Sequence, residues 1–446
     1  ELGSLFPVIS HVMSTSHENP TRRDFIRSGS AVAAVAMAAP AIIVRESAFA
    51  QNADTLKIGL VGCGGRGSGA AGNALTADAN LVLWAVGDAF PEPVKGSVKG
   101  LKEQFGARVQ VAEDRQFVGL DAFKKVIDSG VDIVLLASPP GFRPEHLRYA
   151  VEKGKHIFCE KPMATDAPGV RHVMESVRMS KDKKLCLVAG YCWRYDLPRQ
   201  AFYQQIHDGA LGEVGAVYGT YLTGPVKPMP PANSRPAGMN DLEWQLRNWM
   251  NFTWLSGDGL VEQCIHTVDK VLWAFRDEAP VKCVANGGRV HPNGEGNIFD
   301  HVTVVYEWAN GARGIVAQRQ IAGCYSDNSD YVIGSAGKGW SGWNSPYIKS
   351  GSEIKWRYKG DKPDMYVVEH QVLYKAIREG RVHNDGDRMA RSTMAGIMGR
   401  MAGYTGLEVT WEQALNSGKK LVPDTVSWDM SLAIEPLAQP GKTKTV

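Results

Sequence analysis

The residues best suited to catalysis in this chain are a lysine, Lys161, and a histidine, His266. Lys161 stands in the tripeptide Glu160-Lys161-Pro162, directly after the short apolar run 156–159. An ammonium group at the end of a buried strand can bind the oxygen of a hydroxyl or carbonyl group that is being oxidised or reduced. We therefore expect Lys161 to polarise a substrate oxygen, provided that the surrounding elements bring a hydride acceptor alongside.

His266 lies in the stretch 260–275, which has the pattern of a helix. Glu262, His266 and Asp269 are spaced four and three residues apart, so they share one face of that helix. A histidine there can accept the substrate proton, and Glu262 or Asp269 can orient its ring. The spacing equally suits a carboxylate–histidine pair that only stabilises the helix. The sequence offers no complementary ligand cluster, so we expect no metal site.

Short apolar runs alternate with helical patterns through the first part of the chain. Alternation of this kind predicts right-handed crossovers and a parallel sheet that is covered on both faces. We therefore expect a six-stranded, doubly wound domain over residues 51–190. Its strands should be 56–61, 81–86, 108–111, 133–137, 156–159 and 185–189, and its helices include 122–128, 142–152 and 169–180.

The first expected strand runs directly into a glycine-rich turn. A turn of this spacing brings the backbone close to a pyrophosphate and places the phosphates at a helix N-terminus. Asp88 follows the second strand, where a carboxylate accepts hydrogen bonds from ribose hydroxyls and repels a 2′-phosphate. These features favour NAD, although Arg66 could assist the phosphate of NADP. The expected coenzyme contacts are Gly62, Gly64, Gly65, Arg66, Gly67, Asp88, Ser138, Pro139, Glu160 and Lys161.

The composition is that of a globular protein with more than one domain. The chain has 446 residues, of which 44% are hydrophobic and 22% are charged, and its formal net charge is +3. That length exceeds one ordinary core, and so small a charge gives no sign of a nucleic-acid or membrane surface. The seven cysteines are odd in number and contain no CxxC pair, so we expect neither a disulfide framework nor a zinc site.

Residues 1–50 have the features of a twin-arginine export signal. Arg22 and Arg23 precede an alanine-rich apolar run, 31–44, and a small-residue cleavage site, 48–50. The run is too short for a typical membrane-spanning helix, although an uncleaved anchor or a buried helix is an alternative. We expect the twin-arginine translocation machinery to export the folded protein to the periplasm or beyond. Because free coenzyme should be scarce there, the protein would need to hold NAD tightly.

The pattern changes after residue 190, where strands follow one another without intervening helices. The runs 216–222, 281–286, 301–308 and 314–321 predict a mainly antiparallel sheet in a second, α+β domain over residues 191–446. Arg194 and Tyr195 follow the last parallel strand and are candidate substrate contacts. The stretch 225–254 is rich in proline and tryptophan, including Trp254, and suits either sugar binding or a packed loop or subunit contact.

Several of these segments together resemble the glucose–fructose oxidoreductase / inositol dehydrogenase / rhizopine catabolism (Gfo/Idh/MocA) family. The resemblance covers roughly residues 55–415 and includes the glycine turn, the segment 132–139, the run 150–162 and the His266 helix. It implies a Rossmann domain followed by an open-faced sheet domain that often forms the oligomer contact, as a dimer or tetramer. It also implies that Lys161 and His266 match the catalytic lysine and histidine of the family.

The chain departs from the family pattern at two positions near the expected site. Glu262 stands where many members carry aspartate, and Arg143 stands where many carry a histidine, with His146 nearby. A longer carboxylate and a different charge would both change the contacts made to the substrate. The identity of the substrate therefore does not follow from the resemblance.

These observations predict an exported NAD(P)-dependent oxidoreductase that moves hydride between a sugar or cyclitol hydroxyl and a tightly bound coenzyme. An alternative is a redox-neutral glycosidase of the same family, in which transient oxidation is followed by elimination, hydration and reduction. A nucleotide-binding sensor is a third reading, but it leaves Lys161 and His266 without a role. The candidate substrate contacts are Arg194, Tyr195, Trp254 and His266.

Overall fold

The computed structural model of the protein describes residues 54–291 and 294–444. The export signal predicted for residues 1–50 lies outside these ranges. Among the helices within them, none combines the length and the apolar character needed to cross a lipid bilayer.

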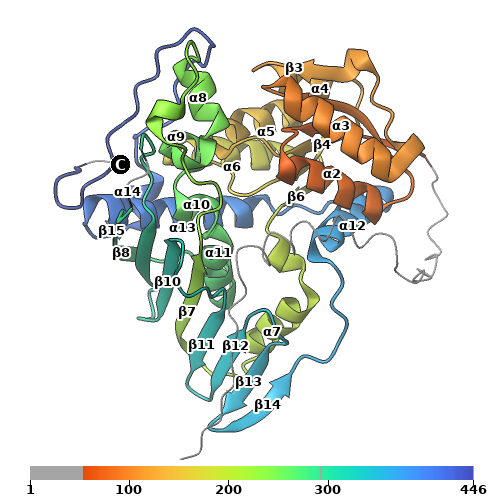
Figure 1. Ribbon diagram of the computed structural model, residues 1–446. Helices are drawn as coiled ribbons and strands as arrows, with labels where there is room; N and C mark the ends of the chain where they lie inside the picture. The colour runs from red at the N-terminus through yellow and green to blue at the C-terminus, as the bar shows by residue number, and fades with distance from the viewer. Residues whose placement is uncertain (1–53, 292–293, 445–446) are drawn as a thin grey trace, which may run out of the picture. The chain divides into compact units, whose positions relative to one another are not determined.

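The first domain is a six-stranded parallel sheet in the strand order β3-β2-β1-β4-β5-β6. This is the doubly wound order, and helices lie on both faces of the sheet (Figure 1). Burial on both faces explains why β4 and most of β5 consist of consecutive apolar residues. The strands are β1 (Leu56–Val61), β2 (Leu81–Asp88), β3 (Gln116–Val118), β4 (Ile133–Leu136), β5 (His156–Cys159) and β6 (Leu187–Ala189).

Five of the six strands lie where the sequence predicts them, and the third does not. The segment predicted as a strand, 108–111, begins inside a 3-10 turn (Gly106–Arg108), and its Val109 forms only an isolated bridge to Leu83. The edge strand is instead Gln116–Val118, which pairs with the end of β2. A three-residue, partly exposed strand has no apolar run long enough to mark it.

The helices of the first domain connect the strands and carry the turns that matter for the site. The predicted helix 122–128 agrees with the structure, and the others shift by one or two residues at their ends. They are α2 (Gly65–Ala77), α3 (Pro91–Phe105), α4 (Ala122–Asp128), α5 (Arg143–Glu152) and α6 (Ala167–Asp182).

The second domain is a nine-stranded sheet in the order β14-β13-β12-β11-β7-β10-β9-β8-β15. Only β7 and β10 pair in parallel, so the sheet is mainly antiparallel as predicted. The strands are β7 (Val214–Thr223), β8 (Lys282–Gly288), β9 (His301–Glu307), β10 (Arg313–Gln320), β11 (Asp330–Gly334), β12 (Lys338–Ser341), β13 (Tyr347–Ser350), β14 (Glu353–Arg357) and β15 (Val409–Thr410).

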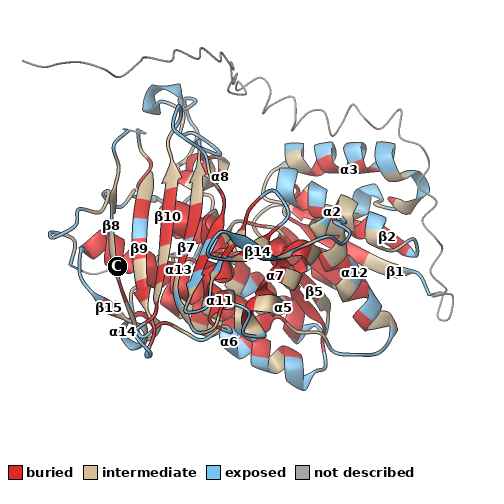
Figure 2. Ribbon diagram, turned by 90° about the horizontal axis from the view of Figure 1, so that it is seen from below, coloured by how far each residue is buried: buried red, intermediate tan, exposed pale blue. Residues whose placement is uncertain are grey.

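Helices cover one face of this sheet and leave much of the other exposed. α11 packs on β7 and α13 packs on β8 (Figure 1). Figure 2 shows the burial alternating along the strands, as expected for a sheet with one covered face. The helices after the first domain are α7 (Leu197–His207), α8 (Asp241–Arg247), α9 (Thr253–Ser256), α10 (Gly259–Glu262), α11 (Ile265–Ala274), α12 (Met365–Arg378), α13 (Gly386–Thr405) and α14 (Trp411–Leu415).

One helix from the later part of the chain returns to the first domain. α12 packs against α2, and its Leu373, Tyr374 and Ala376 belong to the apolar core of the parallel sheet. The folding unit built on the parallel sheet therefore includes a segment beyond residue 190. Both sheets belong to one compact unit over residues 54–446.

Candidate active site

The glycine turn between β1 and α2 has the geometry of a phosphate cradle. Gly62 has a positive φ of 92°, and a Cβ on Gly67 would lie 1.8 Å from the Gly62 carbonyl oxygen, so both positions require glycine. Gly64 and Gly65 instead face open space, and no side chain caps the first turn of α2. The free N–H groups of this turn suit an anion.

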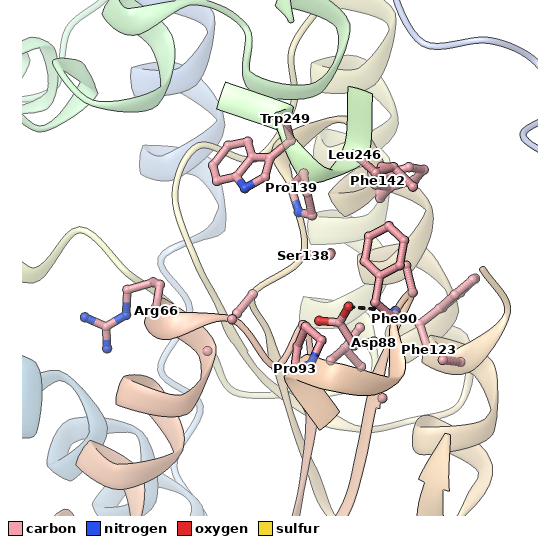
Figure 3. A pocket seen from close by; sticks show the side chains of 18 of the residues that line it. Arg66, Asp88, Phe90, Pro93, Phe123, Ser138, Pro139, Phe142, Leu246 and Trp249 are labelled. Carbon is pink, nitrogen blue, oxygen red and sulfur yellow. Dashed lines mark hydrogen bonds between the residues drawn. The ribbon is translucent and has the colours of Figure 1, made fainter. Parts of the chain in front are cut away.

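Asp88 closes the turn from the end of β2. Its Oδ2 accepts a hydrogen bond from the Cys63 N–H at 2.7 Å, and its Oδ1 accepts one from the Phe90 N–H at 3.1 Å (Figure 3). Burial raises the pKa of the Asp88 carboxyl, and these backbone N–H groups oppose that rise. Each oxygen keeps a further acceptor position that can receive a ribose hydroxyl.

A cavity of about 400 Å³ lies over this turn. Ser138 and Pro139, two of the expected coenzyme contacts, line it just after β4, and the Ser138 Oγ lies 2.9 Å from the His146 Nδ1. The volume of the cavity and the glycine turn that lines it fit a dinucleotide coenzyme. The phosphates would lie at the N-terminus of α2 and the adenosine ribose at Asp88.

Lys161 is held by the segment that precedes the His266 helix. Its Nζ donates hydrogen bonds to the Glu262 backbone oxygen at 2.5 Å and to the Glu262 Oε1 at 3.0 Å. Both side chains are buried, at 10% and 8% exposure. A buried ammonium with a fixed carboxylate partner is pre-organised and can bind a substrate oxygen without large rearrangement.

Glu160 connects Lys161 to the cavity. Its Oε1 accepts from the Arg66 Nε at 3.0 Å, and Arg66 lines the cavity at the glycine turn. On its other side, a Cβ at Gly190 would lie 2.7 Å from the Glu160 Oε2, so the end of β6 must be glycine to admit this carboxylate. Neither Glu160 nor Lys161 lines the cavity itself, and the ion pair with Arg66 is the contact that links this segment to the cavity wall.

His266 lies at the start of α11 and is held by aromatic rings. Its ring stacks on Trp193 at 5.8 Å between centroids and meets the edge of Tyr191 at 6.2 Å. Burial lowers the pKa of His266 well below its usual value, and the charges of Lys161, Lys270, Arg66 and Arg199 lower it further. The imidazole is therefore neutral at pH 7, and its Nδ1 is buried without a hydrogen-bond partner among the described residues.

The expected carboxylate partners of His266 are engaged elsewhere. The predicted helix 260–275 is broken at Gln263 and Cys264, where the Cys264 N–H bonds to the Gly259 oxygen five residues back. The Glu262 carboxylate pairs with Lys161. Asp269 accepts two hydrogen bonds from the buried guanidinium of Arg194, so neither carboxylate orients the imidazole.

The other predicted substrate contacts are also internal. Arg194 is 5% exposed and bridges Asp269 to Asp277. Tyr195 is 5% exposed and donates to the Asp385 Oδ2 at 2.5 Å. Both belong to a 3-10 turn (Cys192–Tyr195) that directs its side chains into the interior. Trp254 is 8% exposed, donates to the Gln245 Oε1, and packs against Phe142.

The tryptophan-rich stretch 225–254 lies over the coenzyme cavity, with Leu246, Arg247 and Trp249 in its lining. The sequence had suggested a sugar platform or a packed loop or subunit contact for this stretch. Arg143, one of the two departures from the family pattern, donates to the Pro162 oxygen at 2.6 Å and so fixes the segment after Lys161. This contact joins residues 19 positions apart and has no signal in the sequence.

Because Trp193 carries the ring of His266, replacing it should misplace the base. We expect Trp193→Leu to lower kcat about 10–100-fold, since displacements of the order of 1 Å reduce rates by such factors. Trp193→Phe keeps a flat ring and should recover most of the loss. Steady-state kinetics of the three proteins, with coenzyme affinity measured separately, check this expectation. An equal loss in both variants would show that stacking does not position the imidazole.

The fold and the site together define a class of protein. A doubly wound domain carries the glycine turn and the strand-end Lys161, and helix α11 of the open-sheet domain carries His266. These parts together are those of a nicotinamide-dependent oxidoreductase. The chain belongs to the Gfo/Idh/MocA family. The model of the oxidoreductase family with an NAD-binding Rossmann fold matches residues 56–191, and the model of the Gfo/Idh/MocA C-terminal domain matches residues 200–338.

Individual relatives are distant. Inositol 2-dehydrogenase of Rhizobium meliloti (strain 1021) is 27% identical over 285 residues, which is 64% of this chain and 74% of the relative. Glycosyl hydrolase family 109 protein 1 of Bacteroides fragilis (strain YCH46) is 28% identical over 171 residues, covering 38% of this chain and 35% of that protein. A structure of levoglucosan dehydrogenase with NADH and levoglucosan superposes with a TM-score of 0.64 at 19% identity, covering 80% of this chain and 100% of that one.

Proposed function

We propose that this protein oxidises or reduces a CH–OH group of a sugar or cyclitol with a tightly held nicotinamide coenzyme. The observation that carries the proposal is the buried Lys161 ammonium, which Glu262 fixes and whose charge helps to depress the pKa of His266. The neighbouring Glu160 pairs with Arg66 of the cavity lining. Membership of an NAD-binding oxidoreductase family and the similarity to inositol 2-dehydrogenase support the substrate class.

Each residue has a separate part in this chemistry. Lys161 donates a hydrogen bond to the substrate oxygen and stabilises negative charge on it. Neutral His266 accepts the hydroxyl proton during oxidation and returns it during reduction. Glu262 holds Lys161 in place, and Trp193 holds His266. The coenzyme, when bound, supplies the hydride acceptor or donor that pairs with this proton transfer.

Asp88 favours NAD over NADP. Its carboxylate is aligned by the Cys63 and Phe90 N–H groups, and a 2′-phosphate next to it would meet like charge. Arg66, the residue that could have aided a phosphate, instead pairs with Glu160. The other basic residues of the lining are Lys227 and Arg247, so a 2′-phosphate would have to recruit one of them.

We further propose that the protein is exported and that it forms homo-oligomers. The twin-arginine pattern at residues 21–27 supports passage to the periplasm in the folded state. The open sheet exposes Tyr218 and Tyr331, whose rings stack at 5.8 Å, together with Ile333 at 47% exposure. An apolar patch of this kind suits a homo-oligomer contact through the second domain.

A redox-neutral glycosidase is the second candidate, favoured by the similarity to a glycosyl hydrolase family 109 protein. One experiment separates the two functions. The purified protein is incubated with a panel of cyclitols, free sugars and aryl glycosides, and the products and the coenzyme redox state are measured. Net NADH formation, or conversion of one sugar at the expense of another, supports the oxidoreductase. Aglycone release with no net redox change supports the glycosidase, and no turnover on any compound contradicts both.

A further inference from the structure

The second domain forms a roof over the coenzyme cavity. The roof comprises residues 241–251, which contain α8 and a 3-10 turn (Trp249–Asn251). Leu246 and Trp249 face Asp88, Phe90 and Pro93 across the cavity (Figure 3). A coenzyme seated on the glycine turn would therefore be covered on its adenosine side by residues that the dinucleotide-binding domain does not supply.

Arg247 fastens this roof to the first domain. Its guanidinium lies 4.1 Å from the centroid of the Phe90 ring, and its Nη2 lies 3.5 Å from the Glu92 Oε1. Within the roof, its Nε pairs with the Glu243 Oε1 at 2.8 Å. These contacts are partly exposed, so each is weak and reversible on its own. They bridge the two walls of the cavity at its rim.

The tail of the chain braces the roof from outside. Residues 421–434, which we name the strap, run past α8 and α9 (Figure 1). Trp428 of the strap lies 5.7 Å from Phe90 between ring centroids, so the strap also reaches the cavity rim. The strap packs Leu421, Val422, Val426, Trp428, Met430, Leu432 and Ile434 on a cluster built from Leu242, Trp244, Leu246, Phe252, Trp254 and Leu255.

Hydrogen bonds anchor the strap at both ends, on different domains. At its start, the Leu421 N–H donates to the Asp166 Oδ2 at 2.7 Å, at the N-terminus of α6. At its end, the Leu432 N–H donates to the Asp241 Oδ2 at 3.2 Å, and the Leu432 oxygen accepts from the Gln245 Nε2 at 2.9 Å. The roof is therefore tied to the dinucleotide-binding domain through the strap as well as through Arg247.

We propose that the roof and strap form a clasp that makes the coenzyme a resident group, released only when the strap contacts break. The inference rests on the proposed function, because it requires a coenzyme on the glycine turn. Lifting the roof exposes the apolar cluster and breaks the Leu432 bonds, so the open state is rare and coenzyme exchange is slow.

A resident coenzyme constrains the reaction. Hydride taken from the carbon of one alcohol leaves the coenzyme reduced, and the clasp slows its replacement. The hydride must then pass to a carbonyl carbon before the next cycle, either that of a second sugar or that of the same molecule after rearrangement. The first case yields one oxidised and one reduced sugar, and the second has no net redox change.

The test is the rate of coenzyme release from the full-length protein. NADH-loaded protein is mixed with excess NAD, and the NADH that remains bound is followed after rapid gel filtration. We expect Trp428→Ala and Asp241→Ala to release NADH about tenfold faster than the wild type, because each removes strap contacts without removing a group that lines the cavity. The matched control is Trp356→Ala, which deletes a half-buried tryptophan that packs on Phe202 at the far edge of the second sheet.

The outcomes separate the clasp from the function itself. Faster release in both strap variants, with the control like the wild type, supports the clasp. Release at the wild-type rate in both variants, or an equal increase in the control, overturns it while coenzyme-dependent turnover persists. Circular dichroism checks that the wild type is folded. If the folded wild type binds no NADH at all, both the proposed function and the clasp are contradicted.

Discussion

Lys161→Met should abolish most turnover while leaving the coenzyme bound. Removing a single donor to a developing oxyanion lowers rates by about 10²–10³-fold, and Lys161 is the buried cation to which the proposed mechanism gives this part. The glycine turn and Asp88 are untouched, so the NAD content should stay at the wild-type level. Turnover with the preferred substrate and NAD per protein by mass spectrometry are the two measurements.

The control for this variant removes the charge of Glu262, the carboxylate that pairs with Lys161 in the wild type. Without Lys161, Glu262 is a buried acid that has lost its ion-pair partner, and breaking a buried pair costs a few kcal/mol of stability. The double variant Lys161→Met/Glu262→Gln removes that charge and should recover the melting temperature but not the turnover. Wild-type turnover in either protein would remove Lys161 from the chemistry.

His266→Asn should reduce turnover by about 10²–10⁴-fold, the usual contribution of a positioned general base. The pH dependence of the wild-type rate should be that of an enzyme whose base, His266, stays neutral throughout the physiological pH range. Burial and four nearby cations lower the pKa of His266, so protonation of its ring, which would stop oxidation, begins only well below pH 6.5.

The rate of alcohol oxidation should consequently hold steady as the pH falls from about 7.5 to 6. Initial rates over this range, corrected for substrate ionisation and stability, test the point. A loss of activity centred near pH 6.5 that disappears in His266→Asn would contradict the depressed pKa. A rate unchanged in His266→Asn would exclude the imidazole as the base.

The parts of the fold that the sequence predicts are those with strong local signals. β1 and β5 agree residue for residue, because their buried parts, 58–61 and 157–159, are covered on both faces and consist of apolar residues and glycine. The glycine turn is recognisable from the spacing of its glycines, and the structure adds a steric reason, because a Cβ at Gly62 would lie 2.7 Å from the backbone of Ala137 and Ser138. β3 was missed because a short edge strand needs no apolar run.

The site was harder to predict wherever the decisive contact is between distant segments. The helical spacing predicts that Glu262 and Asp269 contact His266. In the structure the helix is interrupted at Gln263 and Cys264, and Glu262 pairs with Lys161, 101 residues earlier in the chain. Asp269 goes to Arg194, 75 residues away. The helical periodicity shows which residues share a face of one helix. It does not show which side chains of other segments pack against that face.

The most direct test of the whole account is a crystal structure of the full-length protein with NAD. We predict the pyrophosphate on the N-terminus of α2, the adenosine ribose on Asp88, and the nicotinamide ring beside the Lys161 Nζ with His266 on the substrate side. An empty glycine turn in a crystal saturated with NAD, or a nicotinamide ring out of reach of both Lys161 and His266, would contradict it.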